Sequence, residues 1–338
     1  MQHLRDARMG SEPLRRAGIA RPIFQAPMGS LASPELAAAV SNAGAVGHLA
    51  CTWRTPAGLA EAIRATRALT DKPFGANFVL DFPIEEQLSL ALELRVPVIS
   101  FFWGTGARYV ERVKSSGALA IQVIGSVAEA LAAAAAGFDL LVAQGRDAGG
   151  HVCSQLGLMA LLPQVVDAVA PTPVLAAGGI ADRRGVAAAL ALGARGVWVG
   201  TRFLAALEAN IHPIYRERVL AANADDTLYS QVFDRGWPEA ALRALRNSTT
   251  RAWERAGRPP PGSRPGEDDI LGHYADGTPI PRYSSGSPTR EVSGEIEAMV
   301  QYAGGAVGLV RRCEPAAAIV EDLAAGLGLE AHNRNLPT

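Results

Sequence analysis

One structural unit recurs along more than half of this sequence: a short apolar run, a polar or glycine turn, and an amphipathic stretch rich in Ala and Leu. The unit repeats from Pro22 to about Phe203. Each apolar run is enriched in Val, Ile or Phe and is continuous rather than alternating, as expected for strands that are buried on both faces. The runs are Pro22–Ala26, Ala45–Leu49, Phe74–Leu80, Val96–Phe102, Leu119–Ile124, Leu140–Ala143, Pro173–Ala177 and Gly196–Val199.

Eight strands that alternate with helices predict a parallel α/β fold, because parallel neighbours need a long crossover, usually a helix. Helical patterns such as Thr55–Ala68 and Arg183–Leu192 supply these crossovers. Eight is also the number of strands that closes a barrel. The alternative, an open doubly wound sheet, would carry a G-x-G-x-x-G turn after its first strand, whereas this chain has Gln25–Gly29 there. We therefore predict an α/β fold of the (β/α)₈ TIM-barrel type.

The composition changes after the eighth strand, and the sequence predicts three parts. Residues 1–207 form the barrel, residues 208–290 a small, mainly helical cap inserted after strand eight, and residues 291–338 C-terminal helices that pack back on the barrel. The cap should cover the C-terminal mouth, where an insertion after a strand emerges. Its Pro-, Gly- and charge-rich stretch Arg258–Asp269 is expected to be a mobile loop. Tyr283 and Ser284 are candidate residues of the substrate pocket.

Composition excludes several classes of function. The formal net charge is −1, so no overall field attracts nucleic acid or an anionic membrane surface. Only Lys72 and Lys114 among the 32 basic residues are lysines, and both lie away from the glycine-rich motifs, which argues against a lysine-centred mechanism. The three cysteines are far apart and form no C-x-x-C pair. We therefore expect no metal site, and reduced thiols in a cytoplasmic protein.

Two glycine turns predict a phosphate site. Strand seven ends in Gly178 and Gly179, and strand eight ends in Gly200 and Thr201. In barrels, the loops after strands seven and eight commonly bind phosphate through backbone N–H groups. Glycine allows the phosphate oxygens to approach closely, and the Thr201 hydroxyl adds a donor. One Gly-Gly pair could be a plain tight turn, but two turns at these strands favour phosphate binding.

Other strand ends offer small residues and buried amides. The first strand ends in Ala26, Pro27, Met28 and Gly29, where a flat ring could lie against the backbone. Asn77 and Gln122 are amides within apolar runs, where an unpaired polar group costs about 1–3 kcal/mol. A flavin edge, with its donors and acceptors, would satisfy them. Neighbouring backbone groups are the alternative partners.

His151 is the candidate catalytic residue. It follows strand six on a glycine-rich backbone that includes Gly149 and Gly150. Imidazole titrates near neutral pH, so a histidine here can act as a base, a donor or an anion anchor. A purely structural loop histidine is the alternative reading.

These motifs together resemble the nitronate monooxygenases, formerly called 2-nitropropane dioxygenases. The resemblance covers nearly the whole chain, and its most specific parts are Ala148–His151, Gly178–Asp182 and Gly200–Phe203. The same barrel occurs in flavin NAD(P)H:quinone reductases and FMN-dependent enoyl-acyl-carrier-protein reductases. The motifs are specific to this superfamily and less specific to one activity within it.

The resemblance implies FMN as the cofactor and His151 as the catalytic histidine. It places Ala26–Gly29, Asn77, Gly149 and Gly150 at the flavin ring and Gln122 at its pyrimidine edge, and it assigns the two glycine turns to the phosphate. Many relatives have a lysine where this chain has Gln122. The implied reaction is oxidation of alkyl nitronates by O₂ to a carbonyl compound and nitrite. The expected partners are therefore a small-molecule substrate and O₂, and a homodimer is compatible with the sequence.

Three alternatives stay open at this stage. The first is an FMN-dependent NAD(P)H:quinone or enoyl-thioester reductase on the same barrel. The second is a barrel of the inosine-monophosphate dehydrogenase type, which uses a cysteine after strand six. Cys153 lies there, but the Gly-Ser-Ile-Cys type of loop is absent. The third is a protein that stores flavin or binds other proteins without catalysis.

Overall fold

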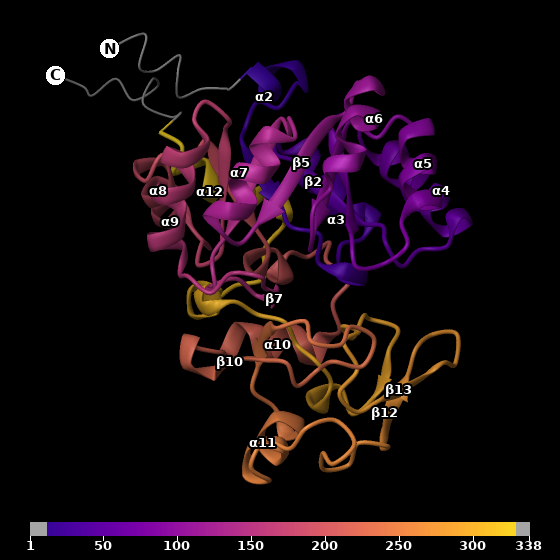
Figure 1. The fold of residues 1–338 in the computed structure, drawn as a ribbon. Helices are drawn as coiled ribbons and strands as arrows, with labels where there is room; N and C mark the ends of the chain where they lie inside the picture. Colours follow the sequence, from indigo (N-terminus) through magenta and orange to yellow (C-terminus); the bar gives the residue numbers. More distant parts are fainter. Residues whose placement is uncertain (1–11, 329–338) are drawn as a thin grey trace, which may run out of the picture.

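The computed structural model describes residues 12–328 and shows a barrel of eight parallel strands (Figure 1). The sheet order is β1-β9-β8-β6-β5-β4-β3-β2. A parallel bridge between Phe24 and Val46 closes the barrel, and the backbone N–H of Gln25 donates to the Val46 carbonyl at 2.9 Å. The predicted barrel is confirmed. Its strands are β1 (Ile23–Gln25), β2 (Gly47–Ala50), β3 (Phe74–Val79), β4 (Val98–Phe102), β5 (Leu119–Ile124), β6 (Leu140–Gln144), β8 (Val174–Ala177) and β9 (Gly196–Val199).

The strands are apolar throughout because both of their faces are buried. One set of side chains, including Phe24, Ile121 and Trp198, fills the barrel interior. Their neighbours along the strands, such as Phe101, pack in a second cluster with the helices outside. This two-sided burial accounts for the continuous apolar runs of the sequence.

Helices surround the barrel, and four of them begin at a side-chain cap. Ser33, Thr55, Ser126 and Asp182 each accept a backbone N–H in the first turn of the helix that follows. This is the usual way to satisfy free N–H groups at a helix start. The helices are α2 (Glu12–Arg16), α3 (Pro34–Asn42), α4 (Pro56–Leu69), α5 (Glu85–Glu93), α6 (Val110–Ser115), α7 (Val127–Ala135), α8 (Leu158–Val169), α9 (Arg183–Ala191) and α12 (Ala316–Ala325).

The two ends of the barrel are covered differently. At the N-terminal end, Leu14 of α2 and Ile19 pack into the interior cluster. Figure 1 shows the cap at the opposite end. The chain enters the cap after β9 and returns as α12, which packs against α3 and α9. Helix α12 thus occupies the place of the eighth barrel helix, and the predicted insertion after strand eight is confirmed.

The cap contains short helices and two small sheets. One sheet, β10-β11-β7, includes Gly150 and His151 of the loop after β6. The other, β13-β12-β14, brings residues 293–294 to the cap, so that α12 is the part that returns to the barrel. The cap elements are β7 (Gly150–His151), α10 (Pro213–Ala221), β10 (Thr227–Ser230), β11 (Leu242–Leu245), α11 (Ser248–Arg255), β12 (Ile270–His273), β13 (Pro279–Pro281) and β14 (Ser293–Gly294).

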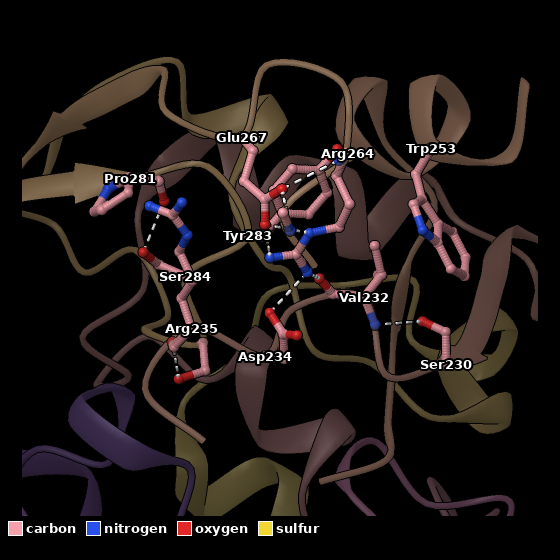
Figure 2. Close-up of polar contacts among 12 residues, drawn as sticks. Ser230, Val232, Asp234, Arg235, Trp253, Arg264, Glu267, Pro281, Tyr283 and Ser284 are labelled. Atoms are coloured by element: carbon pink, nitrogen blue, oxygen red, sulfur yellow. Dashed lines mark hydrogen bonds and ion pairs between the residues drawn. The ribbon is translucent and has the colours of Figure 1, made fainter. Parts of the chain in front are cut away.

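The segment Arg258–Asp269, predicted to be a mobile loop, is anchored at its centre by Arg264 (Figure 2). The Arg264 side chain is 3% exposed and binds the Asp234 and Glu267 carboxylates, at 2.7 and 2.5 Å. It also donates to the Val232 carbonyl at 3.1 Å and lies 4.2 Å above the Tyr283 ring. We call Arg264, Asp234, Glu267 and Tyr283 the Arg264 cluster. Its contacts fix the centre of this segment against the rest of the cap.

Within residues 12–328, no helix is both long enough and apolar enough to cross a membrane.

Candidate active site

A cavity of about 1470 Å³ lies between the C-terminal ends of the barrel strands and the cap. Single ligand pockets measure roughly 300–1,000 Å³, so there is room here for a cofactor and a substrate together. Most of the residues predicted from the sequence line this cavity. They are Ala26, Pro27, Met28, Gly29, Asn77, Gly149, Gly150, His151, Gly178, Gly179, Gly200, Thr201 and Ser284.

The glycine turns after β8 and β9 form one wall. Gly178 and Gly179 have φ of +107° and +70°, a region in which side chains are strained, and a Cβ on Gly178 would lie 3.0 Å from the Ala148 amide nitrogen. Gly200 has an ordinary φ of −108°, and a Cβ there would meet only the Ala26 Cβ, at 3.5 Å. The turns therefore present bare backbone to the cavity. Such a wall fits a phosphate group.

The N-terminus of α9 contributes less to this wall. The Asp182 side chain already accepts the N–H groups of Arg184 and Gly185, at 2.9 and 3.3 Å. A carboxylate at this position also opposes the approach of an anion to the helix. Anion binding must therefore come mainly from the turns. Thr201, on the other side, accepts the Gly304 N–H with its Oγ1 at 3.0 Å, which links the turn after β9 to the cap.

Of the two predicted amides, Asn77 lines the cavity and Gln122 does not. The Gln122 Oε1 accepts the Gly106 N–H at 2.9 Å, and its Nε2 donates to the Gly104 and Val123 carbonyls at 3.1 and 3.0 Å. Backbone groups thus satisfy this amide outside the cavity lining. Its neighbour Val123 lines the cavity instead, because successive residues of a strand face opposite sides.

Of the two candidate pocket residues from the cap, one lines the cavity and the other does not. Ser284 lines the cavity. Tyr283 is fully buried in the Arg264 cluster, and its hydroxyl donates to the Pro265 carbonyl at 2.8 Å. Tyr283 therefore does not line the cavity.

His151 lies half-buried among aromatic rings. As part of β7 it pairs with Leu242 of β11, which binds the loop after β6 to the cap. Its ring centroid lies 4.1 Å from that of Trp237, 5.5 Å from Tyr302 and 6.2 Å from Trp103. Among the described residues, its enclosed Nε2 has no hydrogen-bond partner. Burial lowers the pKa of His151 to about 3, so the imidazole is neutral at ordinary pH.

Sequence reasoning missed the aromatic residues of the site. Trp53 and Trp103 closely follow β2 and β4 and so lie at the same end of the barrel as His151. Their position after a strand was the signal that could have identified them. Trp237 lies in the cap, more than 80 residues from His151 in the sequence. Only the fold brings these two residues together.

A second histidine, His48 on β2, is buried away from the cavity. Its ring lies 4.5 Å from the Trp198 ring in the barrel interior. Both ring nitrogens are enclosed and have no hydrogen-bond partner within residues 12–328. Burial lowers the pKa of His48 to about 3 as well. The folded protein therefore holds two neutral histidines.

Acid should destabilise the protein through these two histidines. As the pH falls below about 6.5, the unfolded chain protonates both, whereas the folded chain keeps them neutral until a pH of about 3. Each should cost about 2 kcal/mol between pH 8 and pH 5. Urea unfolding at the two pH values measures the loss. His48→Leu should lower this pH-dependent loss of unfolding free energy by the part that His48 contributes. His273→Gln, at an exposed position of β12, should leave the loss unchanged. If His48→Leu lost as much stability as the wild-type protein, His48 would not be a source of the acid sensitivity.

No group of three or more His, Cys, Asp or Glu side chains in the described part of the chain could hold a metal ion.

Comparisons with known proteins find relatives in sequence and in fold. The chain matches the family model described as nitronate monooxygenase over residues 13–89 and 82–326. It is 37% identical over 267 residues to a probable nitronate monooxygenase of Bacillus subtilis, which covers 66% of this chain and 77% of that relative. Among solved structures, FabK from Thermotoga maritima matches with a TM-score of 0.81 and 32% identity, over 94% of this chain and 96% of that one. The similarity therefore extends over both barrel and cap.

A further relative carries a different name. The chain is 40% identical over 229 residues to the (3aS,4S,5R,7aS)-5-hydroxy-7a-methyl-1-oxo-octahydro-1H-indene-4-carboxyl-CoA dehydrogenase of Mycobacterium tuberculosis. That match covers 67% of this chain and 64% of the dehydrogenase, just under two thirds of its length. Proteins of similar sequence thus bear names for different redox reactions.

Proposed function

The chain belongs to the nitronate monooxygenase family, a class of oxidoreductase enzymes, and from this premise we propose that it oxidises alkyl nitronates with O₂, using FMN. Two nitronates and one O₂ give two carbonyl compounds and two nitrite ions: each carbon gains one oxygen atom of O₂ as its C–N bond breaks. The observation that carries the proposal is the placement of His151 and the two glycine turns around one cavity. This arrangement puts a phosphate wall and a neutral imidazole within reach of the same ligand space.

The residues of the cavity fit FMN. In this proposal the phosphate binds to the backbone at Gly178, Gly179 and Gly200, where side chains are lacking. The ring lies along the turn Ala26–Gly29, beside Asn77, whose Nδ2 is held by the Ser100 Oγ at 2.9 Å. A mononucleotide needs one phosphate-binding wall, and the bare backbone of the two glycine turns fits that requirement. When bound, the flavin supplies a ring that takes up electrons from the substrate and returns them to O₂.

His151 is proposed to bind the anionic nitro group rather than to remove a proton. General bases work best with a pKa near the working pH, and burial holds the pKa of His151 at about 3. A neutral imidazole still carries one N–H, which can donate to a nitronate oxygen. The preferred substrate is therefore the pre-formed nitronate.

Purified protein tests this proposal directly. After loading with FMN it should show the visible absorption bands of an oxidised flavin, release FMN rather than FAD on denaturation, and convert a nitronate to nitrite with consumption of O₂ and no NAD(P)H. Protein that binds no flavin, or that releases FAD, would contradict the cofactor assignment. Nitrite production that requires NAD(P)H would contradict the reaction.

Replacing Gly200 with leucine should abolish FMN retention and leave the fold intact. The backbone conformation at Gly200 accepts a side chain without strain, and the added atoms would fill the proposed phosphate space. The measurement is the amount of FMN that stays bound to the protein after gel filtration. Circular dichroism checks that the variant is folded. Gly308→Leu is a matched control, since a Cβ there meets its nearest atom at 3.5 Å and Gly308 does not line the cavity. Full FMN retention in Gly200→Leu would refute the phosphate site.

A reductase is the second candidate function. It is supported by the similarity to the indene-carboxyl-CoA dehydrogenase and to FabK, and by a cavity with room for a substrate beside the cofactor. Under this alternative NAD(P)H would reduce the flavin, and a quinone or an enoyl thioester would accept the electrons. Rapid flavin bleaching by NADH under anaerobic conditions, with no bleaching by a nitronate, would favour the reductase.

We also propose a cytoplasmic setting. Cys51, Cys153 and Cys313 are free, and Cys51 is fully buried. Free thiols suit a reducing compartment. Cell fractionation would test this, and recovery of the protein outside the cytoplasm would overturn it.

A further inference from the structure

A continuous aromatic surface runs from the rim of the cavity to His151. Trp53, Phe102 and Trp237 line the cavity, and we call these three residues the aromatic wall. The Trp237 ring lies 6.0 Å from Trp53 and 6.4 Å from Phe102. Phe82 and Trp103 support the wall from behind, each within 5.5 Å of the Trp237 ring. Four of the five residues come from barrel loops or strand ends and Trp237 from the cap.

Trp53 is the unusual member, because its side chain is 56% exposed. A single exposed apolar residue needs no explanation on a protein surface. Trp53, however, lies on a cavity wall and continues a row of rings that meet edge to face or tilted. Its indole therefore offers a free apolar face to whatever enters the cavity.

The inner part of the wall is fixed in place. The Trp237 Nε1 donates to the Asp81 carboxylate at 2.9 Å, which ties the cap to the loop after β3. The same ring packs 4.1 Å from His151. A substrate whose reacting carbon lies near His151 would therefore place its remaining part along Trp237 toward Trp53.

Arg54 and Arg235 also line the cavity, and each has a partner within the protein. The Arg54 Nε donates to the Ala50 carbonyl at 3.0 Å. Arg235 pairs with Asp268, which is fully exposed. The Asp81 carboxylate is occupied by Trp237. The wall itself offers ring faces and edges, which favour an uncharged, flat group.

We propose that the aromatic wall binds an aromatic group of the substrate, and that Trp53 determines this specificity. The proposal rests on the proposed function, since it names the class of nitronate: aryl-bearing rather than short-chain alkyl. Contacts between aromatic rings are typically worth a factor of about 2 to 13 beyond burial of surface. Trp53→Ala should therefore lower kcat/KM for a phenyl-bearing nitronate about tenfold.

The test compares the nitronates of 1-nitro-2-phenylethane and of nitroethane. The wild-type protein should prefer the phenyl-bearing nitronate in kcat/KM. Trp53→Ala should lose most of this preference, mainly through KM, with little change for the nitroethane nitronate, and Trp53→Phe should retain part of it. Met159→Ala is the matched control, because Met159 is 70% exposed and does not line the cavity.

Two outcomes would overturn the proposal: no preference for the phenyl-bearing nitronate in the wild-type protein, or an unchanged preference in Trp53→Ala. A binding measurement separates this proposal from the proposed function. The FMN-loaded protein is titrated with 2-phenylethanol and with ethanol, neither of which is a nitronate, and tryptophan fluorescence is followed. Tighter, Trp53-dependent binding of 2-phenylethanol without any nitronate turnover would support the wall and contradict the reaction. Nitronate turnover without this binding would support the reaction and contradict the aromatic wall.

Discussion

Replacing His151 with alanine should lower kcat/KM for a nitronate by about 10²–10³, the usual cost of removing one donor to a developing or bound anion. FMN retention should stay the same, because the glycine turns that are proposed to hold the phosphate follow β8 and β9, whereas His151 follows β6. No other imidazole lines the cavity within residues 12–328. Steady-state kinetics on the FMN-loaded variant, with the flavin content measured for each sample, give the result.

Two substrates then separate the possible roles of His151. A loss on both the neutral nitroalkane and its pre-formed nitronate assigns the histidine as an anion anchor, which is the expected result for an imidazole whose pKa burial lowers to about 3. A loss confined to the nitroalkane assigns it as the base. His212→Asn is the control, since His212 caps α10 through its Nδ1 and lies outside the cavity lining. Wild-type kinetics on both substrates would remove His151 from the mechanism.

The barrel and most of the cavity could be predicted because each depends on local sequence. Continuous apolar runs identify strands buried on both faces, and a residue that follows such a strand lies at the C-terminal mouth whatever its neighbours are. His151 and the turns at Gly178 and Gly200 were found by this rule. It would also have found Trp53 and Trp103, which follow strands in the same way.

Gln122 and Tyr283 show where local sequence is insufficient. Gln122 and Val123 lie on the same strand, and a difference of one residue decides which of them faces the cavity. The partners of Gln122 are backbone groups of a neighbouring loop, which the sequence does not reveal. Tyr283 faces inward because of Arg264, 19 residues earlier in the chain.

The cap was harder to predict than the barrel because its elements depend on distant partners. Its sheet β10-β11-β7 borrows a strand from the loop after β6. The residues of β10 and β11 have no strong strand pattern of their own, and their pairing with that loop decides their conformation. The contact between Trp237 and His151 depends on the same pairing.

Replacing Arg264 with alanine should lower the free energy of unfolding by about 3–5 kcal/mol, the range for removing one partner of a buried ion pair. The side chains of Asp234 and Glu267 are 14% and 13% exposed, so their carboxylates would remain largely buried without a counter-ion. Urea unfolding measures the change. Arg258→Ala is the control: this arginine belongs to the same segment, is 59% exposed and pairs with Glu254, and should contribute no more than about 1 kcal/mol.

The loss of Arg264 should also reduce turnover at temperatures where the variant is folded. Arg264 holds Val232 and Asp234, and the Asp234 carbonyl accepts the N–H of Trp237 at 3.0 Å. The segment that Arg264 fixes therefore ends in the ring that packs against His151. FMN retention should not change, since the phosphate turns belong to the barrel. Wild-type turnover in the folded variant would limit the Arg264 cluster to a role in stability.

A triple variant shows whether Arg264 stabilises the cap through its charge or through its packing. If the cost comes from uncompensated charge, adding Asp234→Asn and Glu267→Gln to Arg264→Ala should restore much of the stability, because neutral amides are cheaper to bury than carboxylates. If it comes from packing, the triple variant should remain as unstable as Arg264→Ala, because the ring of Tyr283 would still lack the guanidinium 4.2 Å above it. We expect recovery, since both carboxylates are held mainly by Arg264 and the cation–π contact is worth only about 0.5–2 kcal/mol.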